Sequence, residues 1–558
     1  MPLAPLTKLR LYLQSVSYLR RDQLAYLMFR RMMRAHSRPH RALDRIRQRD
    51  NRTVDFATVT SSRELDRLAL GDAEEIPPEK IDWQTAQIWR PLRYQVHYFD
   101  FLNDRAYSDE WKGEALEDWI LGNPAAVGDG WIPYAVSLRI VNWIKFFTHV
   151  GSPIAELRLE SLYAQALWLE RNLERHILAN HYLKNAKALV FAGLFFDGTD
   201  ARRWLRTGLA IFCSEAKEQF LLDGGHFERS PMYHALAVED LLDTINYLEA
   251  AAVTSEPATL TFLRNCARAA LDFYAAILLP DGQIPLFNDS AFNVGLQPDE
   301  LFAYAHSTLG YTRTTQGEGM TVHALSSSGY YVIRSAADML VLDCGAPGPR
   351  YQPGHAHCDC LSYELAIAGR RIAVDTGVFN YENNAARHYA RGTSAHNTVQ
   401  VDSAEQSEMW DVFRVGRRAN PLGANLSTTG AGTAVFTGAH DGFRGLAPGI
   451  IHRRTVGLAG RVWSFEDCVE GEGAHAIQSR VHIEASLAAH VDCQTVRITS
   501  SEDGAIAELR AQGPLAIRTE SAPYYPSFGR YKEGTVIVME WQGRLPITLS
   551  YTIAPASQ

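Results

Sequence analysis

The pattern of apolar and polar positions changes its character once along this chain. Up to about residue 310, apolar residues recur at helical spacing, and the short connectors between these segments carry Gly, Pro or Asp. We expect helices at residues 115–121, 135–147, 157–173, 186–196, 202–221, 235–252 and 259–279. Repeated helices with little strand character indicate paired helices in a toroid or a solenoid, and the periodicity does not separate the two.

The composition shifts to Gly, Thr and Ser around residues 313–320, and strand-like runs follow. We expect strands at residues 330–334, 338–343, 433–437, 450–456, 462–466, 505–510 and 535–541. Short strands at this spacing are typical of an antiparallel sandwich. The predicted plan is a multidomain chain, α then β, with an N-terminal arm at 1–75, a helical domain at 76–315 and a β domain at 316–558.

Composition and charge narrow the class of protein. A chain of 558 residues is too long for one ordinary core, and a hydrophobic content of 46% excludes a disordered protein. The net charge of −8 gives no case for nucleic-acid binding. Residues 1–52, however, carry thirteen Lys or Arg against three Asp, which fits a solvated helical face or a peripheral contact with a polyanion or an anionic membrane.

The sequence also bears on location. No run approaches the length of a transmembrane helix, and the apolar stretch at residues 24–29 is too short for a signal-peptide core. The seven cysteines are scattered and odd in number, which indicates reduced thiols. We therefore expect a cytoplasmic protein, with a periplasmic or membrane-peripheral location as the alternative, and the sequence leaves the oligomeric state open.

The segment at residues 353–402 carries the densest set of potential ligands. We expect it to form three short strands, with His357, Asp375 and His396 one on each. Two imidazoles and a carboxylate suit zinc or a similar divalent metal, but they equally suit a buried hydrogen-bonded cluster without one. On a regular strand His355 points to the same face as His357 and is left for another task.

Two stretches of the helical half are polar where their neighbours are apolar. Asn180 and His181 stand just before the apolar run at 186–196. Ser230 and Pro231 make a good helix start that puts Tyr233 in the first turn, where the helix dipole favours a phenolate. Taken singly, each residue is better explained by a structural role, as a helix cap, a buried polar group or a packing residue, than by a catalytic one.

Taken together, these stretches resemble a known family. NHYLKNAKALVFAG, DGGHFERSPMYH, DGQIPLFND and GHAHCDCLSYEL, followed by VDTGV and SAHNT, look like the heparinase II/III family of polysaccharide lyases. The likeness extends to WIPYAVSLRIVNW and VHYFDFL and covers residues 80 to 420 approximately. It implies an incomplete (α/α) toroid followed by an antiparallel β-sandwich, with the active cleft between them.

The implied activity is β-elimination at a uronic acid of an acidic polysaccharide or oligosaccharide. By resemblance, Asn180 hydrogen-bonds the substrate carboxylate, and His181 assists as neutraliser or base. Tyr233 protonates the leaving oxygen or serves as base, and His355 completes the cleft. His357, Asp375 and His396 match the family's zinc ligands, which implies one structural or orienting zinc ion.

Four further residues are candidates for the sugar groove: Tyr134, Arg139, Trp143 and Asn288. Two competing functions stay open. A glycoside hydrolase needs two carboxylates facing one cleft, and Glu228, Asp289 and Asp223 are available for it. The other is a non-catalytic sugar-binding protein of a polysaccharide-assembly system, which has no need of the complete set Asn180, His181, Tyr233 and His355.

Overall fold

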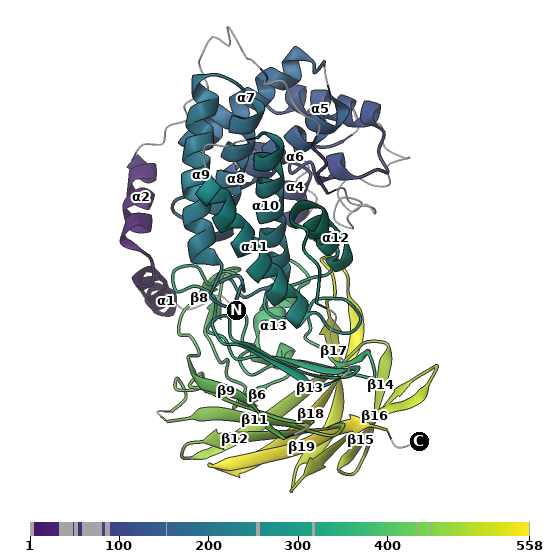
Figure 1. The fold of residues 1–558 in the computed structure, drawn as a ribbon. Coiled ribbons are helices and arrows are strands. Elements are labelled where there is room, and N and C mark those ends of the chain that lie inside the picture. The colour runs from purple at the N-terminus through teal and green to yellow at the C-terminus, as the bar shows by residue number, and fades with distance from the viewer. Residues whose placement is uncertain are drawn as a thin grey trace.

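The chain folds into a helical half and a β half, joined in that order (Figure 1). The computed structural model describes residues 5–32, 48, 54–57, 81–83, 90–151, 153–252, 257–314, 319–430, 432–447 and 449–556. The last helix of the first half ends at Leu309, and the first strand of the second half begins at Thr321. The predicted boundary between residues 315 and 316 lies outside the described residues.

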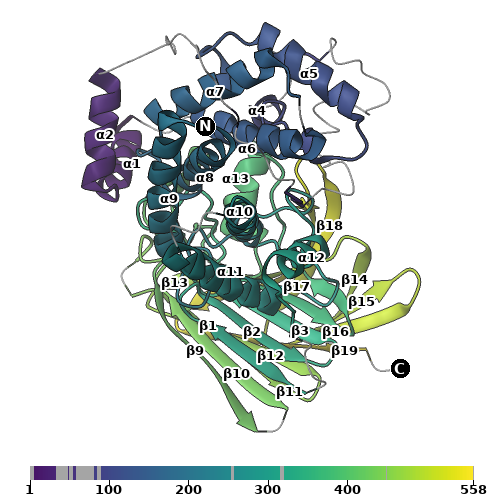
Figure 2. The same ribbon diagram turned by 45° about the horizontal axis from the view of Figure 1, so that its top comes forward.

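The helical half is an incomplete ring of helices, which Figure 2 shows nearly end on. Its described helices are α4 (Arg90–Gln95), α5 (Asp109–Gly122), α6 (Pro133–Val150), α7 (Glu156–Arg171), α8 (Ala179–Phe195), α9 (Thr199–Gln219), α10 (Pro231–Ala250), α11 (Pro257–Ile277) and α12 (Pro298–Leu309). Two 3₁₀ turns, η2 (Asp100–Asn103) and η3 (Asp129–Trp131), precede α5 and α6 respectively. These helices confirm the predicted paired-helix architecture.

The helices begin where the sequence offers caps. The Ser230 side chain accepts a hydrogen bond from the Tyr233 backbone N–H at 3.1 Å, and Pro231 opens α10. Helix α8 starts earlier than its apolar run predicts. Asn180 and His181 therefore lie inside its first turn instead of ahead of it, and they project from a packed helix.

The β half is a sandwich of two antiparallel sheets. The nine-stranded sheet runs β1-β2-β3-β4-β5-β13-β18-β17 with β6 paired to β13, and the eight-stranded sheet runs β14-β15-β16-β19-β12-β11-β10-β9. The bounds in the first sheet are β1 (Thr321–Leu325), β2 (Tyr330–Ser335), β3 (Asp338–Asp343), β4 (Tyr363–Ile367), β5 (Arg370–Ala373), β6 (Val399–Val401), β13 (Ala474–Ile483), β17 (Ala516–Tyr524) and β18 (Lys532–Arg544).

The second sheet packs its apolar face against the first. Its strands are β9 (Pro421–Gly430), β10 (Thr433–His440), β11 (Ile451–Ala459), β12 (Val462–Glu470), β14 (Leu487–Asp492), β15 (Thr495–Ser500), β16 (Gly504–Gln512) and β19 (Ile547–Pro555). Exposed and buried residues alternate along β12, so that Trp463 and Phe465 point inward. Phe465 stacks between Tyr363 of the first sheet and Tyr551, with ring centroids 4.6 and 4.8 Å away.

Loops between these strands carry α13 (Ala385–Arg391), η4 (Thr393–Ala395) and the small pair β7 (Met409–Trp410) and β8 (Arg414–Val415). They lie at the edge of the sandwich that faces the helices (Figure 1). An ion pair joins the two halves where Arg371 of β5 meets Asp281 at 2.7 Å. The loop after α11 that holds Asp281 also holds Asp289, which reaches the β half, as described below.

The basic N-terminal arm contributes two helices, α1 (Pro5–Ser17) and α2 (Arg21–Met32). Arg10 of α1 pairs with Glu408 beside β7 at 2.7 Å, and the Tyr26 hydroxyl of α2 donates to the Leu173 carbonyl at 3.1 Å. The arm therefore contacts both halves. Most of residues 33–75 of the predicted arm lie outside the described part of the chain. None of the described helices combines the length and the apolar character that crossing a membrane requires.

Candidate active site

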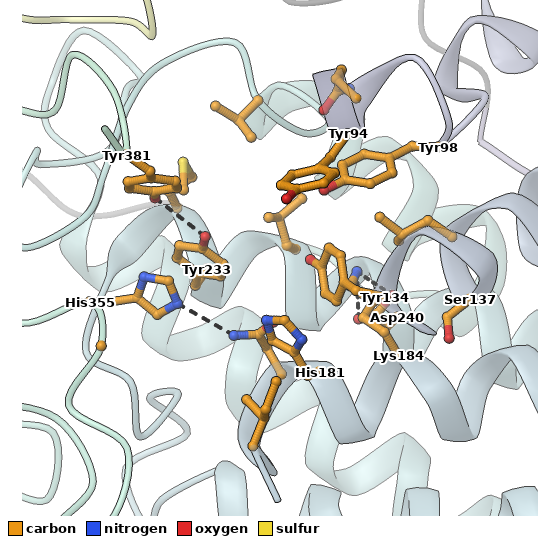
Figure 3. A pocket seen from close by; sticks show the side chains of 18 of the residues that line it. Tyr94, Tyr98, Tyr134, Ser137, His181, Lys184, Tyr233, Asp240, His355 and Tyr381 are labelled. Atoms are coloured by element: carbon orange, nitrogen blue, oxygen red, sulfur yellow. Dashed lines mark hydrogen bonds and ion pairs between the residues drawn. The ribbon is translucent and has the colours of Figure 1, made fainter. Parts of the chain in front are cut away.

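A cavity of about 650 Å³ lies between the helical half and the loops of the sandwich (Figure 3). Helices α6, α8 and α10 supply one wall, and the loops around His355, Tyr381 and Phe413 supply the other. Asn180, His181, Tyr233 and His355 all line it. The structure therefore brings together four residues that are up to 175 positions apart in the sequence.

Asn180 is held by Glu228, a carboxylate that the sequence analysis considered only as a possible catalytic group of a glycoside hydrolase. Its Nδ2 amide donates to both oxygens of Glu228 at 2.9 and 3.0 Å, and its backbone N–H donates to Glu228 Oε1 at 3.1 Å. Glu228 is 1% exposed and Asn180 is 7% exposed. Because three hydrogen bonds fix Asn180, its amide is presented to the cavity in one orientation.

His355 is held from behind by Asp289. Its Nδ1 lies 2.9 Å from Asp289 Oδ2, and its Nε2 lies 3.4 Å from Asn180 Nδ2. A carboxylate at Nδ1 places the proton there, so that Nε2 carries the lone pair and accepts from the Asn180 amide. His355 therefore turns a basic nitrogen toward the cavity.

Asp289 is the shared anchor of this wall. It is buried and also binds His357 Nε2 at 2.9 Å and the Arg387 guanidinium, whose Nη2 lies 3.0 Å from Oδ2. Burial alone would raise the pKa of Asp289, but Arg387 and the two histidines outweigh it and hold that pKa well below its usual range. The carboxylate that orients His355 is therefore ionised.

Tyr233 lies against His355. Their rings stack with centroids 3.8 Å apart, and the Tyr233 hydroxyl lies 3.3 Å from the hydroxyl of Tyr381. Burial, together with Tyr381 and Tyr134 nearby, raises the pKa of Tyr233 well above its usual value. Loss of solvent therefore outweighs the modest effect of the helix dipole, and Tyr233 is a protonated phenol.

His181 follows Asn180 in the first turn of α8 and also lines the cavity. Its Nδ1 is 3.1 Å from Glu174 Oε1, and its ring packs against Tyr134 with centroids 4.4 Å apart. Burial lowers the pKa of His181, but the Glu174 charge and hydrogen bond, with help from Glu228, raise it to a net value above the usual one. The cavity therefore holds an imidazole that favours its cationic form.

Strained backbone surrounds these groups. Leu178, Ala179, Arg229 and Asn288 adopt positive φ angles of 62°, 53°, 57° and 56°, although none of them is glycine. Leu178 and Ala179 immediately precede Asn180, and Arg229 lies between Glu228 and Ser230. Such conformations persist where the surrounding structure imposes them, and here they aim the first turns of α8 and α10 at one point.

A second cluster lies behind His355. Among the described residues, His357, Asp359 and His396 are buried and offer ligand atoms that all lie within 4.8 Å of one another. The His357 Nδ1 and His396 Nε2 atoms are buried without a hydrogen-bond partner in the described structure. Two unpartnered imidazole nitrogens beside a carboxylate fit a divalent metal such as zinc.

Asp375 differs from its predicted place in this cluster. It does not belong to the set of three, and its Oδ2 instead lies 2.7 Å from His396 Nδ1. This bond fixes the tautomer that leaves His396 Nε2 as an acceptor. Asp375 therefore orients the candidate ligand His396, whereas the sequence analysis predicted that Asp375 itself binds the metal.

The expected placement of one ligand on each strand was also wrong. His357 precedes β4, Asp375 follows β5, and His396 lies between η4 and β6. All three lie just beyond the ends of β4, β5 and β6 in the interior of the sheet, where the backbone can converge without filling a ladder position. His355 and His357 accordingly share no strand face.

Of the four residues predicted to line the sugar groove, only Tyr134 lines the cavity. Arg139 and Trp143 are instead fully buried in the helical core. Arg139 donates to Gln165 Oε1 at 2.8 Å and lies over the Trp119 ring, so the groove role expected of Arg139 and Trp143 was wrong. A helical half with this many aromatic rings buries side chains on both faces of α6, which the sequence pattern does not reveal.

Asn288 was also misplaced as a groove residue. It is 4% exposed and uses its side chain to bind the Arg229 carbonyl at 2.9 Å and the His357 backbone N–H at 3.0 Å. It therefore joins the strained turn before α10 to the loop that carries both histidines. Its part is to position those segments from outside the cavity.

Sequence reasoning missed several residues of the site: Glu174, Tyr381 and Asp359, together with the contact that Glu228 makes to Asn180. Glu174 lies in the connector between α7 and α8, so no helical periodicity links it to His181. Tyr381 lies in a loop of mixed composition. Only the CDC triplet around Asp359 carried a signal, because a carboxylate between two cysteines is an unusual neighbour for a buried histidine.

The carboxylates available for glycoside hydrolysis do not face the cavity as a pair. Asp223, Glu228 and Asp289 are absent from the described lining. Asp223 accepts from the Ser328 backbone N–H at 2.8 Å, and Asp289 is occupied by His355, His357 and Arg387. The acid and base of a hydrolase are thus missing from these three positions.

Comparisons with known proteins agree with this architecture. The family model described as "Heparinase II/III N-terminus" matches residues 17–297, and the model described as "Heparinase II/III-like, C-terminal" matches residues 318–552. Curated relatives include a heparin-sulfate lyase of Pedobacter heparinus, 28% identical over 363 residues, covering 59% of this chain and 53% of the relative. A heparin-sulfate lyase of Bacteroides stercoris is 25% identical over 402 residues, covering 60% of this chain and 58% of the relative.

Solved structures share the fold. A structure titled "Crystal Structure of Heparinase III" aligns with a TM-score of 0.70 at 18% identity, covering 96% of this chain and 89% of the other. Heparan sulfate lyase HepC from Pedobacter heparinus aligns with a TM-score of 0.59 at 21% identity, covering 91% and 86%. The chain spans little more than half the length of the curated relatives it matches. Because the two family models together cover both halves almost completely, the chain belongs to the heparinase II/III family.

Proposed function

We propose that this chain is a polysaccharide lyase that cleaves a uronic-acid-containing polysaccharide or oligosaccharide by β-elimination. The observation that carries the proposal is the convergence of Asn180, His181, Tyr233 and His355 on one cavity between the two halves. Membership of the family and similarity to proteins named heparin-sulfate lyases support it.

The reaction needs its substrate carboxylate neutralised before C5 can lose a proton. The Asn180 amide and the cationic His181 face the cavity and serve this purpose, because an amide donor and an imidazolium stabilise charge that spreads onto the carboxylate. The substrate carboxylate replaces the 3.4 Å contact between Asn180 Nδ2 and His355 Nε2, which frees the amide N–H to donate to that carboxylate and frees Nε2 to take the C5 proton. The His355 Nδ1–H remains bonded to the ionised Asp289, which stabilises the imidazolium that forms.

The leaving group is served by Tyr233. As the C5 electron pair forms the C4–C5 double bond, the bond from C4 to the bridging oxygen breaks, and the Tyr233 phenol gives its proton to that oxygen. The raised pKa keeps this proton in place until the oxygen becomes basic. The products are a 4,5-unsaturated uronate and a new sugar hydroxyl, and no water is consumed.

We further propose that zinc occupies the cluster of His357, Asp359 and His396. The ion would tie together three turns of the sandwich and stiffen the wall that holds His355. This chain's residues supply the coupling, because Asp289 binds His357 and His355 with its two oxygens. In this proposal Asn180 and His181, which line the cavity, bind the substrate carboxylate, and the zinc ion does not.

Tyr233→Phe tests the proposed function. Incubation of the chain with a panel of uronate polymers is expected to produce ultraviolet absorbance from the conjugated product, and the variant to lower kcat by about 100-fold or more, because it lacks the transferable proton. Tyr311→Phe is the control, since it removes a phenol that binds Asp272 outside the cavity lining. New reducing ends without absorbance would contradict a lyase, and unchanged turnover in Tyr233→Phe would remove Tyr233 from the mechanism.

A further inference from the structure

The N-terminal arm contacts the segment that leads to Asn180. Helices α1 and α2 lie along the outside of the molecule, across the junction of its two halves (Figure 1). Gln23 of α2 is buried, and its Nε2 donates to the His176 carbonyl at 3.3 Å and lies 3.5 Å from the Ile177 carbonyl. The strained residues 178 and 179 come next in the chain, followed by Asn180. The arm therefore holds the backbone just before the turn that aims Asn180 at the cavity.

The arm also contacts the loop that leads to His355. Arg20 lies in the turn between α1 and α2, and the centre of its guanidinium is 3.9 Å from the centroid of the Tyr351 ring. Arg20 and Tyr351 bind one carboxylate, that of Glu218 on α9. Arg20 Nη1 lies 3.1 Å from Oε2, and the Tyr351 hydroxyl donates to Oε1 at 2.9 Å. We call Arg20, Glu218 and Tyr351 the Tyr351 junction; Tyr351 itself stands four residues before His355.

The Tyr351 ring packs into the helical half. It belongs to a small apolar cluster with three residues of that half: Leu178, Ala179 and Phe227. The first two precede Asn180, and Phe227 precedes Glu228, the carboxylate that holds the Asn180 amide. The centroids of the Phe227 and Tyr351 rings are 6.3 Å apart. The loop that leads to His355 is thus packed into the same cluster as both segments that fix Asn180.

A second aromatic residue of the arm holds the same loop. The Tyr18 ring centroid lies 3.9 Å from the guanidinium of Arg418 and 5.7 Å from that of Arg350, as cation–π contacts. Arg418 Nη1 donates to the Arg350 carbonyl at 2.7 Å, and Arg350 immediately precedes Tyr351. Two neighbouring residues of the loop are therefore bound by two residues of the turn between α1 and α2.

The proposed reaction makes the relative position of the two segments decisive. One uronate has to meet Asn180 from the helical half and His355 from the β half at the same time, and the facing nitrogens of these residues are 3.4 Å apart. A displacement of about 1 Å in a catalytic geometry costs on the order of 100-fold in rate. The contacts of the arm run to the backbone on both sides of this meeting point.

We propose that the N-terminal arm sets the position of the His355 loop relative to Asn180, with Arg20 and Tyr351 as positioning residues. The inference rests on the proposed function, because it concerns how that site is assembled. Both residues lie outside the described cavity lining and act on the reaction through the segments at 176–180 and 350–355. The arm thereby belongs to the catalytic unit, whereas its charge pattern predicted only a solvated face or a peripheral contact.

Arg20→Gln is the first test, since it removes both the ion pair to Glu218 and the cation over the Tyr351 ring. With the uronate polymer that the chain cleaves fastest, we expect kcat to fall about tenfold and KM to stay within about twofold. The sugar still meets the helical wall, but fewer of the bound complexes hold His355 Nε2 beside C5. All rates are measured well below the Tm of each variant, so that loss of folded protein does not imitate the effect.

Arg10→Gln is the matched control. Arg10 belongs to the same arm and also binds one carboxylate with both terminal guanidinium nitrogens, which lie 3.2 and 2.7 Å from the oxygens of Glu408. Glu408 stands beside β7 and outside the loop that leads to His355. We therefore expect kcat and KM of this variant to equal those of the unaltered chain.

Tyr351→Phe isolates the hydroxyl, because it keeps the ring in its cluster and removes the hydrogen bond to Glu218. This variant should lower kcat severalfold. In combination with Arg20→Gln, the loss of kcat should be smaller than the product of the two separate losses, because both changes act through the same carboxylate.

Hydrogen exchange measures the same link without any turnover. The backbone amides of residues 176–180 and 350–355 should exchange faster in Arg20→Gln than in the unaltered chain, and at unchanged rates in Arg10→Gln. Only the first variant loosens the Tyr351 junction, and amides of a loosened segment open more often.

The outcomes separate the inference from the function beneath it. Unchanged kcat, a loss seen only in KM, or unchanged exchange in Arg20→Gln overturns the positioning role. An equal loss of kcat in Arg10→Gln, or fully multiplicative losses in the double variant, overturns the assignment to the Tyr351 junction. A chain that gives no absorbance with any uronate polymer overturns the lyase, and the exchange rates then decide alone whether the arm holds the two segments.

Discussion

At the scale of single residues, carboxylates set the state of each histidine in the site. Asp289 fixes the tautomer of His355, and Glu174 favours the cationic form of His181. Both carboxylates are buried. Two imidazoles that line one cavity are thereby given different tasks, one as a base and one as a cation, by the carboxylates bonded to them.

The Glu174–His181 pair makes the activity depend on pH in a defined direction. The raised pKa of His181 keeps it cationic below its folded value, and this contribution to binding and to stability is lost as pH rises through that value. Burial would raise the pKa of Glu174, but His181 and Asn185 lower it, so its contribution is lost only as pH falls through that lowered value. The pair is therefore most effective between these two limits.

We expect Glu174→Gln to move the alkaline limb of the pH profile of kcat/KM to lower pH, because His181 loses the charge that raises its pKa. The profile is measured on the uronate polymer that the chain cleaves fastest. Glu215→Gln, which removes a buried carboxylate of α9 outside the cavity lining, is the control. An unmoved alkaline limb would show that His181 does not neutralise the substrate carboxylate.

At the scale of elements, the residues of the site come from the first turns of helices and from the segments next to strands. Asn180 and Tyr233 stand in the first turns of α8 and α10, and His355, His357 and His396 stand in the segments that precede β4 and β6. First turns and inter-strand turns leave side chains free to point along a cavity instead of into a core. Caps that hold these starts therefore act on catalysis as well as on stability.

Two helix caps separate these effects. Ser230→Ala and Ser108→Ala each remove a side chain that accepts from the backbone at the start of a helix, α10 and α5 respectively. Ser108→Ala is expected to lower the free energy of unfolding by about 1 kcal/mol. Ser230→Ala is expected to lower it by more, because the buried Ser230 hydroxyl also donates to the Asp289 carbonyl at 2.6 Å. Only Ser230→Ala should also lower kcat, since Tyr233 lies in the turn that Ser230 caps; equal activities of the two variants would contradict this.

At the scale of the whole molecule, Asp289 and the cluster behind it join the two halves. Asp289 belongs to the loop between α11 and α12, yet it binds three residues of the β half. The cavity wall is thus built across the domain junction. Because Asp289 binds both His357 and His355, a metal ion bound to His357, Asp359 and His396 would also restrain the junction of the two halves at His355.

We expect purified protein to contain about one zinc ion per chain and His396→Ala to lower both the metal content and Tm, because ligand loss removes binding free energy from the fold. Elemental analysis and thermal unfolding with and without a chelator measure the two effects. His490→Ala, at an exposed histidine of β14, is the control. A metal-free protein with unchanged Tm on chelation would leave a hydrogen-bonded cluster in place of a zinc site.

The sequence by itself determined the order of the two halves, because helical and strand periodicities follow from how side chains alternate along a local backbone. Its motifs also singled out Asn180, His181, Tyr233 and His355, which the structure places around one cavity. These residues carry a signal because polar groups interrupt apolar segments at helix starts and turns.

Only the tertiary structure decided what stands behind and beside them. Glu174, Glu228 and Tyr381 come from segments whose spacing to their partners no local rule encodes, and Arg139 and Trp143 proved to be core residues because both faces of α6 are covered. Burial also outweighs the helix dipole at Tyr233 and raises the pKa of its phenol. Protonation states and cavity charge depend on what each group loses and meets on folding, and those neighbours exist only in three dimensions.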